Sequence, residues 1–493
     1  MGVSIITLAA LVPLVPLSAG AVVAAAGWHP ATAWAGPLSA ACVTATGVAL
    51  GIHVLDHDPV VALGDLIRVD ALSAFMVIVI GLVAFIATTY GVAYIRAELD
   101  HGHTTARGAR TYGLLVQLFV TAMLVAVLAD NLGVLGVAVE ATTITTAFLV
   151  GHRRTRGSLE ASWKYVVIGS VGLALALLGT VLVYFASRHA GGDAAADLNW
   201  STLVQNAPSL DPGVMRLAVA LLVVGYGTKM GLAPMHTWLP DAHSQAPAPV
   251  SALMSGVLLS VGCYALLRTK VIADAALGPS YLRGLLVAGA LLSIAAAASL
   301  LLAQRDYKRL LAYSSIEHMG LVALAIAIGT PLAVAAALLH ILGHGLSKAV
   351  LFCASGEIAL IDGTTDIAGV RGLLSRRPLV GGVFGLGLVA LLGLPPFSLF
   401  ASELAIARAG VASGLGWAIA VALLLLLVIF AAIVGHAQQM LLGEPAAEVE
   451  HHHHTSVAAA VPLVAGLAAT AALGVSIWPM ERLLHAAAQV VTG

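Results

Sequence analysis

The sequence predicts an all-α polytopic membrane protein, and three observations predict this fold class. The chain of 493 residues is 60% hydrophobic and only 10% charged, whereas a soluble domain carries about 25% charged residues. Its mean hydropathy is +0.99. Its apolar runs reach roughly 17–25 residues, the length of a spanning helix, and they lack the shorter alternating segments of a β-barrel. The net charge of −1 gives no indication of nucleic-acid binding.

About fourteen apolar segments are long enough to cross a bilayer as helices. They lie near residues 3–26, 32–54, 71–95, 112–129, 131–150, 161–187, 214–233, 247–268, 280–303, 307–329, 331–360, 379–404, 411–441 and 456–478. The first segment lacks the preceding basic residues of a cleavable signal peptide, so we expect it to stay in the membrane.

Charges in the loops indicate the orientation of the chain. The loops on one side carry Arg96, Arg107, Arg110, Arg153, Arg154, Arg156, Arg305, Lys308, Arg309, Arg371, Arg376 and Arg377. The loops on the other side carry Asp56, Asp58, Asp65, Asp70, Asp193, Asp197 and Asp211. The positive-inside rule makes the basic side cytoplasmic, which places both termini outside. Arg268, Lys270 and Arg283 fall on the opposite side from the one this rule favours.

Few ionisable residues lie inside the predicted spans. Each is a candidate for function, because an ionisable group at the bilayer centre costs roughly 2.5–3.5 kcal/mol. The candidates are Glu140, Lys164, Lys229, His340, His344, Lys348 and Glu403. Residues four apart lie on one helix face, so His340, His344 and Lys348 form what we call the histidine–lysine stripe.

These residues also have structural interpretations. Lys164 lies near the start of its span, where a lysine can reach the lipid headgroups. Glu140 and Lys229 lie deeper and lower each other's cost if they pair, either as a static ion pair or as a switchable one. A single buried histidine is usually a satisfied core residue, whereas three titratable groups on one face favour a functional role.

Prolines interrupt two of the predicted spans, because proline removes a backbone donor and breaks a helix. The segment 234–249 contains several prolines and follows Lys229, and Pro395 and Pro396 precede Glu403. Broken backbone at membrane depth is tolerated where it is buried in protein or faces a wet cavity. Broken helices in both halves of a chain indicate an ion path between inverted repeats. The first group of prolines also fits an ordinary loop.

A carboxylate, amines and imidazoles in series can pass protons without a cofactor. A lysine beside a carboxylate keeps its proton and releases it when the carboxylate is neutralised or moves away, so Glu140 and Lys229 could form a switch. Histidine titrates near neutrality and suits the middle of a relay, with Glu403 as a terminal group. His340 and His344 lie one turn apart on one helix, so they cannot hold a haem from both faces. The sequence has no nucleotide-binding motif and shows no energy source of its own.

Cysteine and histidine usage gives little indication of a metal or redox centre. Cys42, Cys263 and Cys353 fall in apolar segments without a CxxC pair, which is typical of small buried side chains. The tract HHHH at 451–454 could bind zinc or nickel. A solvated tract is the simpler interpretation, because adjacent loop positions give no preformed tetrahedral site. We therefore expect no cofactor in this chain.

Four stretches are long enough to compare with known families: KMGLAPMHTWLPDAHSQAPAPVSALMSG, QRDYKRLLAYSSIEHMG, LHILGHGLSKAVLFCASG and GLPPFSLFASEL. In these stretches the chain resembles the antiporter-like membrane subunits of respiratory complex I, of Mrp-type sodium/proton antiporters and of membrane-bound hydrogenases. The resemblance runs through about residues 60–440. It implies fourteen helices that include two inverted five-helix repeats.

The resemblance also implies boundaries within the chain. We expect N-terminal helices at 1–111, a first repeat at 112–268, a second repeat at 269–441, and a loop with a C-terminal helix at 442–493.

The resemblance implies a role for each candidate residue. Glu140 and Lys229 match the glutamate/lysine pair of the first half-channel, the histidine–lysine stripe matches the central relay, and Glu403 matches the terminal residue of the second half-channel. In many members a histidine or lysine in the helix after the first break joins the pair to the relay. Here that helix offers serines, so Ser255 and Ser260 are the candidate linkers.

Two further lysines are candidates for the proton pathway. They are Lys164 and Lys308, the second of which lies in QRDYKRLL near a helix start. Lys308 is either a lysine of the cytoplasmic surface or a proton-entry or relay group.

The expected function is a proton-translocating, antiporter-like subunit of a redox complex related to complex I and group 4 hydrogenases. SSIEHMG, SALMSGVLLS and PPFSLFASEL are most similar to the F-type membrane subunit of hydrogenase-4 and formate hydrogenlyase complexes. The alternatives are an Mrp-type cation/proton antiporter subunit and a structural membrane anchor that does not pump. The expected partners are other membrane subunits and a soluble module that holds the redox centres, in a prokaryotic cytoplasmic membrane. The transported ion would be H⁺ or Na⁺.

Overall fold

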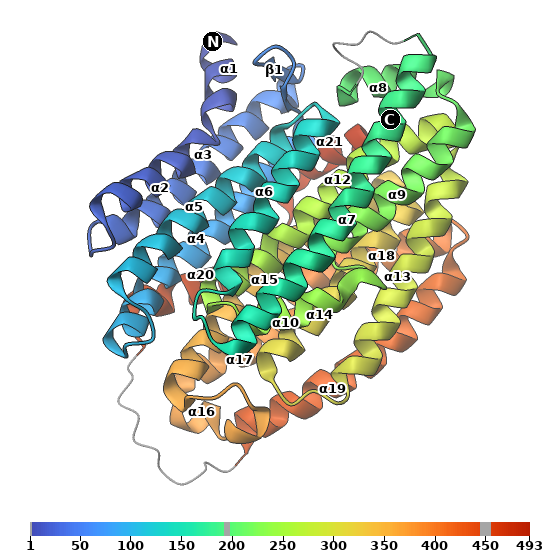
Figure 1. Cartoon of the computed structure of the whole chain (residues 1–493). Helices are drawn as coiled ribbons and strands as arrows, with labels where there is room; N and C mark the ends of the chain where they lie inside the picture. The colour runs from blue at the N-terminus through green and yellow to red at the C-terminus, as the bar shows by residue number, and fades with distance from the viewer. Residues whose placement is uncertain (1, 192–197, 444–454) are drawn as a thin grey trace.

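The computed structural model describes residues 2–191, 198–443 and 455–493, which form an almost entirely helical bundle (Figure 1). Within these ranges, twelve helices are long and apolar enough to cross a membrane, or thirteen if one bent pair counts as a single span. The strands of the described chain form a single short hairpin. The predicted all-α polytopic fold class is therefore confirmed. The tract at 451–454, Asp193 and Asp197 lie outside the described residues.

The N-terminal part begins with a bent pair of helices and ends with the long helix pair that follows the hairpin. Its elements are α1 (Gly2–Leu11), α2 (Leu14–Ala26), α3 (Ala35–Asp56), β1 (Val60–Ala62), β2 (Ile67–Val69), α4 (Ala71–Asp100) and α5 (Ala106–Leu128). The helices α1 and α2 meet at 43° and occupy the predicted span 3–26. The strands pair antiparallel, with Val60 opposite Val69. Asp70 then caps α4 by accepting a hydrogen bond from the backbone N–H of Ser73.

The middle of the chain contains the first broken helix. Its elements are α6 (Leu132–Val150), α7 (Arg156–His189), α8 (Trp200–Asn206), α9 (Pro212–Met230), α10 (Trp238–Gln245), α11 (Ala248–Leu253), the π-helical turn η4 (Met254–Leu258) and α12 (Leu259–Leu277). Gly231 closes α9 in the left-handed conformation, with φ of +83°. The short helices α10 and α11 then carry the chain across the proline-rich segment, so the break lies where the prolines indicate it.

The C-terminal part contains the second broken helix. Its elements are α13 (Pro279–Leu301), α14 (Tyr307–Ile328), α15 (Pro331–Asp362), α16 (Leu373–Arg376), α17 (Pro378–Leu391), α18 (Ser398–Ala412), α19 (Gly416–Leu442), α20 (Val457–Val475) and α21 (Trp478–Thr492). The predicted span 379–404 consists of α17 and α18, two short helices separated by residues 392–397. The final helix, α21, was not among the predicted spans.

Both chain ends lie at the same end of the molecule (Figure 1). The helix α1 packs on β1, and α21 packs on α4 and α15. Arg482 of α21 also binds Asp56 at the end of α3, with 3.0 Å between Nη2 and Oδ1. The last helix of the described chain, α21, is therefore amphipathic and packs with one face against the bundle.

Four helices form the interior of the bundle. Every residue is buried in the most apolar window of α14 and in that of the span Ala248–Leu277, which contains α11, η4 and α12. The buried share is 94% in α15 and 89% in α4, against 28% in α19. A helix surrounded by protein can hold polar groups that lipid would not tolerate. The interior helices are therefore the ones that can carry a line of polar side chains through the membrane region.

Candidate functional site

The first cluster joins Glu140 of α6 to Lys229 of α9 through a threonine hydroxyl. Lys229 Nζ donates to Thr143 Oγ1 at 2.7 Å and to Tyr165 Oη at 2.9 Å. The Thr143 hydroxyl donates to Glu140 Oε2 at 3.1 Å, while Ser170 Oγ donates to Glu140 Oε1 at 3.0 Å. The two charged groups are thus connected by a hydroxyl bridge, where a direct ion pair was one of the expectations.

Close packing of α7 on α9 brings this cluster together. A Cβ added at Gly225 of α9 would lie 2.6 Å from the backbone nitrogen of Ala176 and 2.6 Å from the backbone oxygen of Gly172, both on α7. Only glycine permits such an approach of two backbones. The crossing sets Tyr165 of α7 against the last turn of α9, where Lys229 is buried.

The histidine–lysine stripe lies on α15 and is entirely buried. Lys348 Nζ donates to the backbone oxygen of Leu311 at 2.7 Å and also to Ser314 Oγ. Both partners belong to α14, the neighbouring interior helix. His340 and His344 face this helix too, so the stripe is directed into the bundle and away from lipid.

The helix α14 supplies two groups that the sequence interpretation did not select, Glu317 and His318. His318 Nδ1 lies 3.0 Å from His340 Nε2, and its ring centroid is 5.1 Å from those of His340 and His344. His340 Nδ1 lies 3.0 Å from Ser402 Oγ of α18. Within the described chain, His318 Nε2 and both nitrogens of His344 have no hydrogen-bond partner. His318 therefore lies between the two histidines of the stripe.

The short helix α10 lies between the first cluster and the stripe. Its His243 is fully buried, and neither ring nitrogen has a hydrogen-bond partner in the part of the chain described here. The His243 ring centroid lies 6.0 Å from that of Trp238 and 5.7 Å from that of Phe352. Trp238 in turn lies 4.8 Å from Tyr165, which accepts the hydrogen bond from Lys229.

The serines expected to link the two clusters have other partners. Ser255 Oγ lies 2.8 Å from Ser315 Oγ of α14. Ser260 Oγ donates to the backbone oxygen of Gly256 in the preceding turn at 3.5 Å. The linking role of Ser255 and Ser260 stays a prediction, and the imidazole of His243 is a second group between the two clusters.

Glu403 of α18 lies beside the second break. A Cβ added at Gly393, which has φ of +61°, would collide with both carboxylate oxygens of Glu403. Glu403 and Glu317 line a cavity of about 220 Å³, and Leu427 of α19 forms part of its wall. Leu427 is exposed at the surface, so this cavity connects Glu403 with the outside of the bundle.

Lys164 belongs to a group of surface ion pairs. Its Nζ lies 2.7 Å from Glu160 Oε1 and 3.1 Å from Asp241 Oδ2. Asp241 also binds Arg309, with 2.9 Å between Oδ1 and Nη1. Lys164 is thus far more exposed than Lys229 and lies outside the buried series of polar groups.

Lys308 is buried, so its interpretation as a lysine of the surface is wrong. Its Nζ donates to the backbone oxygen of Ala246, just after α10, at 2.7 Å. Lys308 is therefore placed between the basic loops and the interior.

Residues 129–430 match the family described as "NADH:quinone oxidoreductase/Mrp antiporter, TM". The chain belongs to this family. The hydrogenase-4 component F homolog of Methylacidiphilum infernorum (isolate V4) is 41% identical over 342 residues, which cover 69% of this chain and 71% of that protein. The resemblance seen in the four sequence stretches is therefore confirmed.

Solved structures share the fold of this family member over nearly its whole length. A chain of the membrane-bound sulfane sulfur reductase, an archaeal respiratory membrane complex, superposes with a TM-score of 0.87 at 26% identity, covering 98% of this chain and 97% of that one. A chain of the Mrp complex from Dietzia sp. DQ12-45-1b gives a TM-score of 0.86, with 99% of each chain covered, and its 24% identity makes this a likeness of fold alone.

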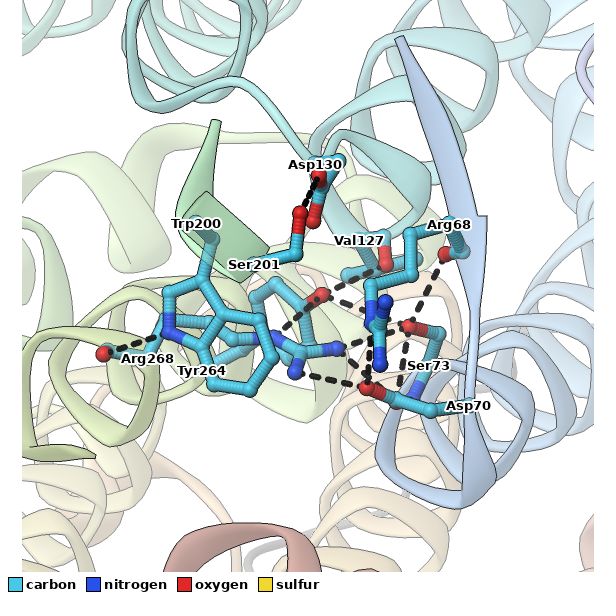
Figure 2. Close-up of polar contacts among 9 residues, drawn as sticks. All are labelled: Arg68, Asp70, Ser73, Val127, Asp130, Trp200, Ser201, Tyr264 and Arg268. Atoms are coloured by element: carbon cyan, nitrogen blue, oxygen red, sulfur yellow. Dashed lines mark hydrogen bonds and ion pairs between the residues drawn. The ribbon is translucent and has the colours of Figure 1, made fainter. Parts of the chain in front are cut away.

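This family member also holds a buried ion pair apart from the candidate pathway (Figure 2). Arg268 of α12 donates from Nη1 and Nη2 to the two oxygens of Asp70 at 2.7 and 2.8 Å. Its Nε donates to Tyr264 Oη at 2.9 Å, and its guanidinium lies 4.4 Å from the ring centroid of Trp200. Burial raises the pKa of Asp70, but the charge of Arg268 and its hydrogen bonds lower it more, to about 2. Arg268, which lies on the side that the positive-inside rule disfavours, is thus a buried partner of Asp70.

Proposed function

We propose that this chain translocates protons as an antiporter-like subunit of a multi-subunit redox complex in a prokaryotic cytoplasmic membrane. The observation that carries the proposal is the series of buried polar groups between Glu140 and Glu403, whose second half lies on the interior helices α14 and α15. Membership of the family supports it, as does the similarity to a hydrogenase-4 component. The redox centres belong to soluble partner subunits in this proposal, and none to this chain.

Lys229 is the switch in the proposed mechanism. A negative charge on Glu140 holds the proton on Lys229, because an opposite charge favours the ionised amine. When a change in a neighbouring subunit withdraws that charge, the amine releases its proton towards His243. The Thr143 bridge couples the two groups without a direct contact between carboxylate and amine.

The second cluster receives the proton. Lys348, His344, His318 and His340 are successive neighbours on α15 and α14, and Glu403 lies at their far end. In this proposal the cavity beside Glu403 is where protons enter or leave the second cluster. We further propose that the basic loops face the cytoplasm, which places both termini outside.

The test replaces one group in each cluster. In the intact complex reconstituted into vesicles, Lys229→Ala and His344→Ala should each abolish proton translocation, because neither alanine can carry a proton. The subunit should remain in the complex in both variants. Lys270→Ala is the matched control, since Lys270 is a buried lysine of α12 paired with Asp274 outside the series.

Unchanged translocation in both variants would contradict the proposed pathway. An intact parent complex that catalyses its redox reaction without moving protons would instead support the structural-anchor alternative. Translocation is measured with a pH-sensitive dye inside the vesicles, and subunit content by gel analysis of the purified complex.

A second candidate function is cation/proton antiport. The observation that favours it is the cavity lined by Glu317 and Glu403, because carboxylate oxygens are the ligands that hard cations prefer. Proton movement that depends on Na⁺ on the opposite side of the membrane would establish this function, whereas equal movement in Na⁺-free buffer would exclude it.

A further inference from the structure

We propose that His318, His340 and Glu403 form a binding site for a divalent transition-metal ion such as Zn²⁺, and that the bound ion blocks proton transfer at this end of the pathway. Metal binding follows from the geometry of these three residues. The blocking effect rests on the proposed function. The ion is an external ligand that competes with protons and is not a resident cofactor.

The three residues are already close to a metal-binding arrangement. Each offers one ligand atom, and these atoms all lie within 4.8 Å of one another. Bonds of roughly 2.0–2.2 Å in a tetrahedral zinc site place the ligand atoms roughly 3.4 Å apart. A side-chain movement of about 1 Å would close the site. Glu403 can make this movement, because its carboxylate borders a cavity.

The ligand chemistry favours zinc-like ions. Two imidazoles and a carboxylate are the ligand set of many zinc sites that keep a fourth position open. His340 Nδ1 contacts Ser402 Oγ at 3.0 Å, which fixes the ring so that Nε2 is directed at His318. His318 Nδ1 and His340 Nε2, 3.0 Å apart, share at most one proton between them. A metal ion bound there takes the place of that proton.

The surroundings of the site supply charge and access. Glu317 lines the same cavity as Glu403, and its Oε1 lies 3.8 Å from His318 Nδ1. Two carboxylates can offset the double charge of the ion, which would otherwise be costly in a buried position. The cavity of about 220 Å³ is large enough to admit a hydrated ion and to leave a water in the fourth ligand position.

Metal binding has a direct consequence for the relay. The imidazoles of His318 and His340 can accept protons only while a ring nitrogen is unoccupied. A bound Zn²⁺ occupies one nitrogen on each ring and also the carboxylate of Glu403. Translocation should therefore stop when the site is filled and resume when a chelator removes the ion.

The first experiment measures binding with Co²⁺, which reports four-coordinate geometry by its visible absorption. It uses the purified intact complex whose chain carries serine at each of positions 451–454, because those histidines would bind the same ion. We expect one equivalent of four-coordinate Co²⁺ that Zn²⁺ displaces. His318→Gln and Glu403→Gln should lose this equivalent, and Ser402→Ala should weaken it about tenfold through loss of the outer contact.

His436→Gln is the matched control and should bind as the parent does. His436 belongs to α19 and contacts the backbone oxygen of Leu301 at 3.1 Å, away from the three ligands. Equal Co²⁺ binding by the parent and by His318→Gln would overturn the site, as would binding without the absorption of four-coordinate Co²⁺. Ser402→Ala keeps the test valid if His318→Gln fails to assemble, since an unchanged affinity in that mild variant would also overturn the site.

The second experiment measures proton translocation by the same parent complex with and without Zn²⁺. Inhibition that appears when Zn²⁺ is added, and that EDTA reverses, supports the proposed block. The same complex without Zn²⁺ should translocate protons at its full rate. Full translocation with the site filled overturns the block. A complex that binds Co²⁺ through His318 but never translocates protons overturns the proposed function and leaves the metal site standing.

Discussion

His243 is notable because it is fully buried and its ring nitrogens have no hydrogen-bond partner in the described ranges. About 90% or more of buried polar groups in proteins are hydrogen-bonded, so exceptions call for an explanation. A role as the proton-carrying group between Lys229 and the histidine–lysine stripe supplies one, with intervening water completing the connections.

We therefore predict that His243→Gln lowers the rate of proton translocation at least about tenfold, because an amide cannot take up and release a proton. Ser260→Ala should leave the rate unchanged, since its hydroxyl is bonded to its own helix. Rates in reconstituted vesicles measure both. The reverse order of effects would support the serine linker and exclude His243.

Sequence alone identified the groups that stand out as charges in apolar runs, such as Glu140, Lys229 and Glu403. It does not single out Glu317 and His318, which lie inside the predicted span 307–329, or His243, which lies in the proline-rich segment. Their importance depends on neighbours from other helices, and spacing along one chain does not show such neighbours. The burial of Lys308 was missed for the same reason.

At the scale of elements, Gly393 determines how the second broken helix presents Glu403. Its φ of +61° favours glycine, and a Cβ there would collide with the Glu403 carboxylate. Gly414 has a similar backbone, with φ of +80°, but a Cβ there would meet nothing within 4 Å. A substitution at Gly414 causes backbone strain alone, whereas the same substitution at Gly393 also displaces the Glu403 carboxylate. Comparing the two therefore separates the two effects.

We predict that Gly393→Ala reduces proton translocation strongly, whereas Gly414→Ala causes only the loss of stability expected from backbone strain, about 1 kcal/mol. Thermal unfolding of the purified complex and translocation in vesicles distinguish the two effects. Equal losses of translocation in the two variants would show that the carboxylate position does not matter.

The Arg268–Asp70 pair connects elements that are far apart in the sequence. It ties the start of α4 to α12, and Trp200 of α8 covers it (Figure 2). Removing one partner of a buried pair costs about 3–5 kcal/mol, because the charge that stays behind loses its compensation. Arg68 Nε, at 3.4 Å from Asp70 Oδ2, keeps a weaker ion pair with Asp70, so the lower end of this range is expected. We predict this loss of stability for Arg268→Ala, measured as the unfolding midpoint in detergent. Arg482→Ala removes the exposed pair with Asp56 and should change the midpoint little.

The same pair sets a pH dependence. Because the folded-state pKa of Asp70 is lowered to about 2, the stabilisation from its ionised form is present at neutral pH. It declines as the pH falls below the ordinary carboxyl value of about 4, and it is lost near the folded-state pKa. Arg268→Ala should remove this acid-dependent part of the stability, whereas a parent and variant with parallel profiles would contradict the assignment.

At the scale of the whole molecule, hydropathy alone identified the membrane spans well, because a bilayer requires long apolar helices. The breaks were also indicated, since proline acts locally on the backbone. The amphipathic helix α21 was missed because its buried face is completed by contacts with α4 and α15 and its own sequence is not apolar enough for a span. Arg268 opposed the charge rule because its partner, Asp70, lies in a distant segment.

Orientation is the remaining prediction at this scale. With Cys42 replaced by serine, since it is the exposed cysteine of the described chain, we predict that Gln489→Cys is labelled by a membrane-impermeant thiol reagent in intact cells. Arg107→Cys should react only after the cells are opened, because it lies in a basic loop on the opposite side. Labelling in the opposite order would reverse the orientation.

The Thr143 hydroxyl has one hydrogen, which it donates to Glu140 while its oxygen accepts from Lys229. If the proton on Lys229 leaves towards Glu140 instead of towards His243, the Thr143 oxygen passes its own hydrogen to Glu140 and keeps the arriving one. The kept hydrogen then points back towards the amine. The hydroxyl must rotate about its C–O bond before a second proton can follow. The bridge can therefore transfer only one proton for each rotation of the hydroxyl.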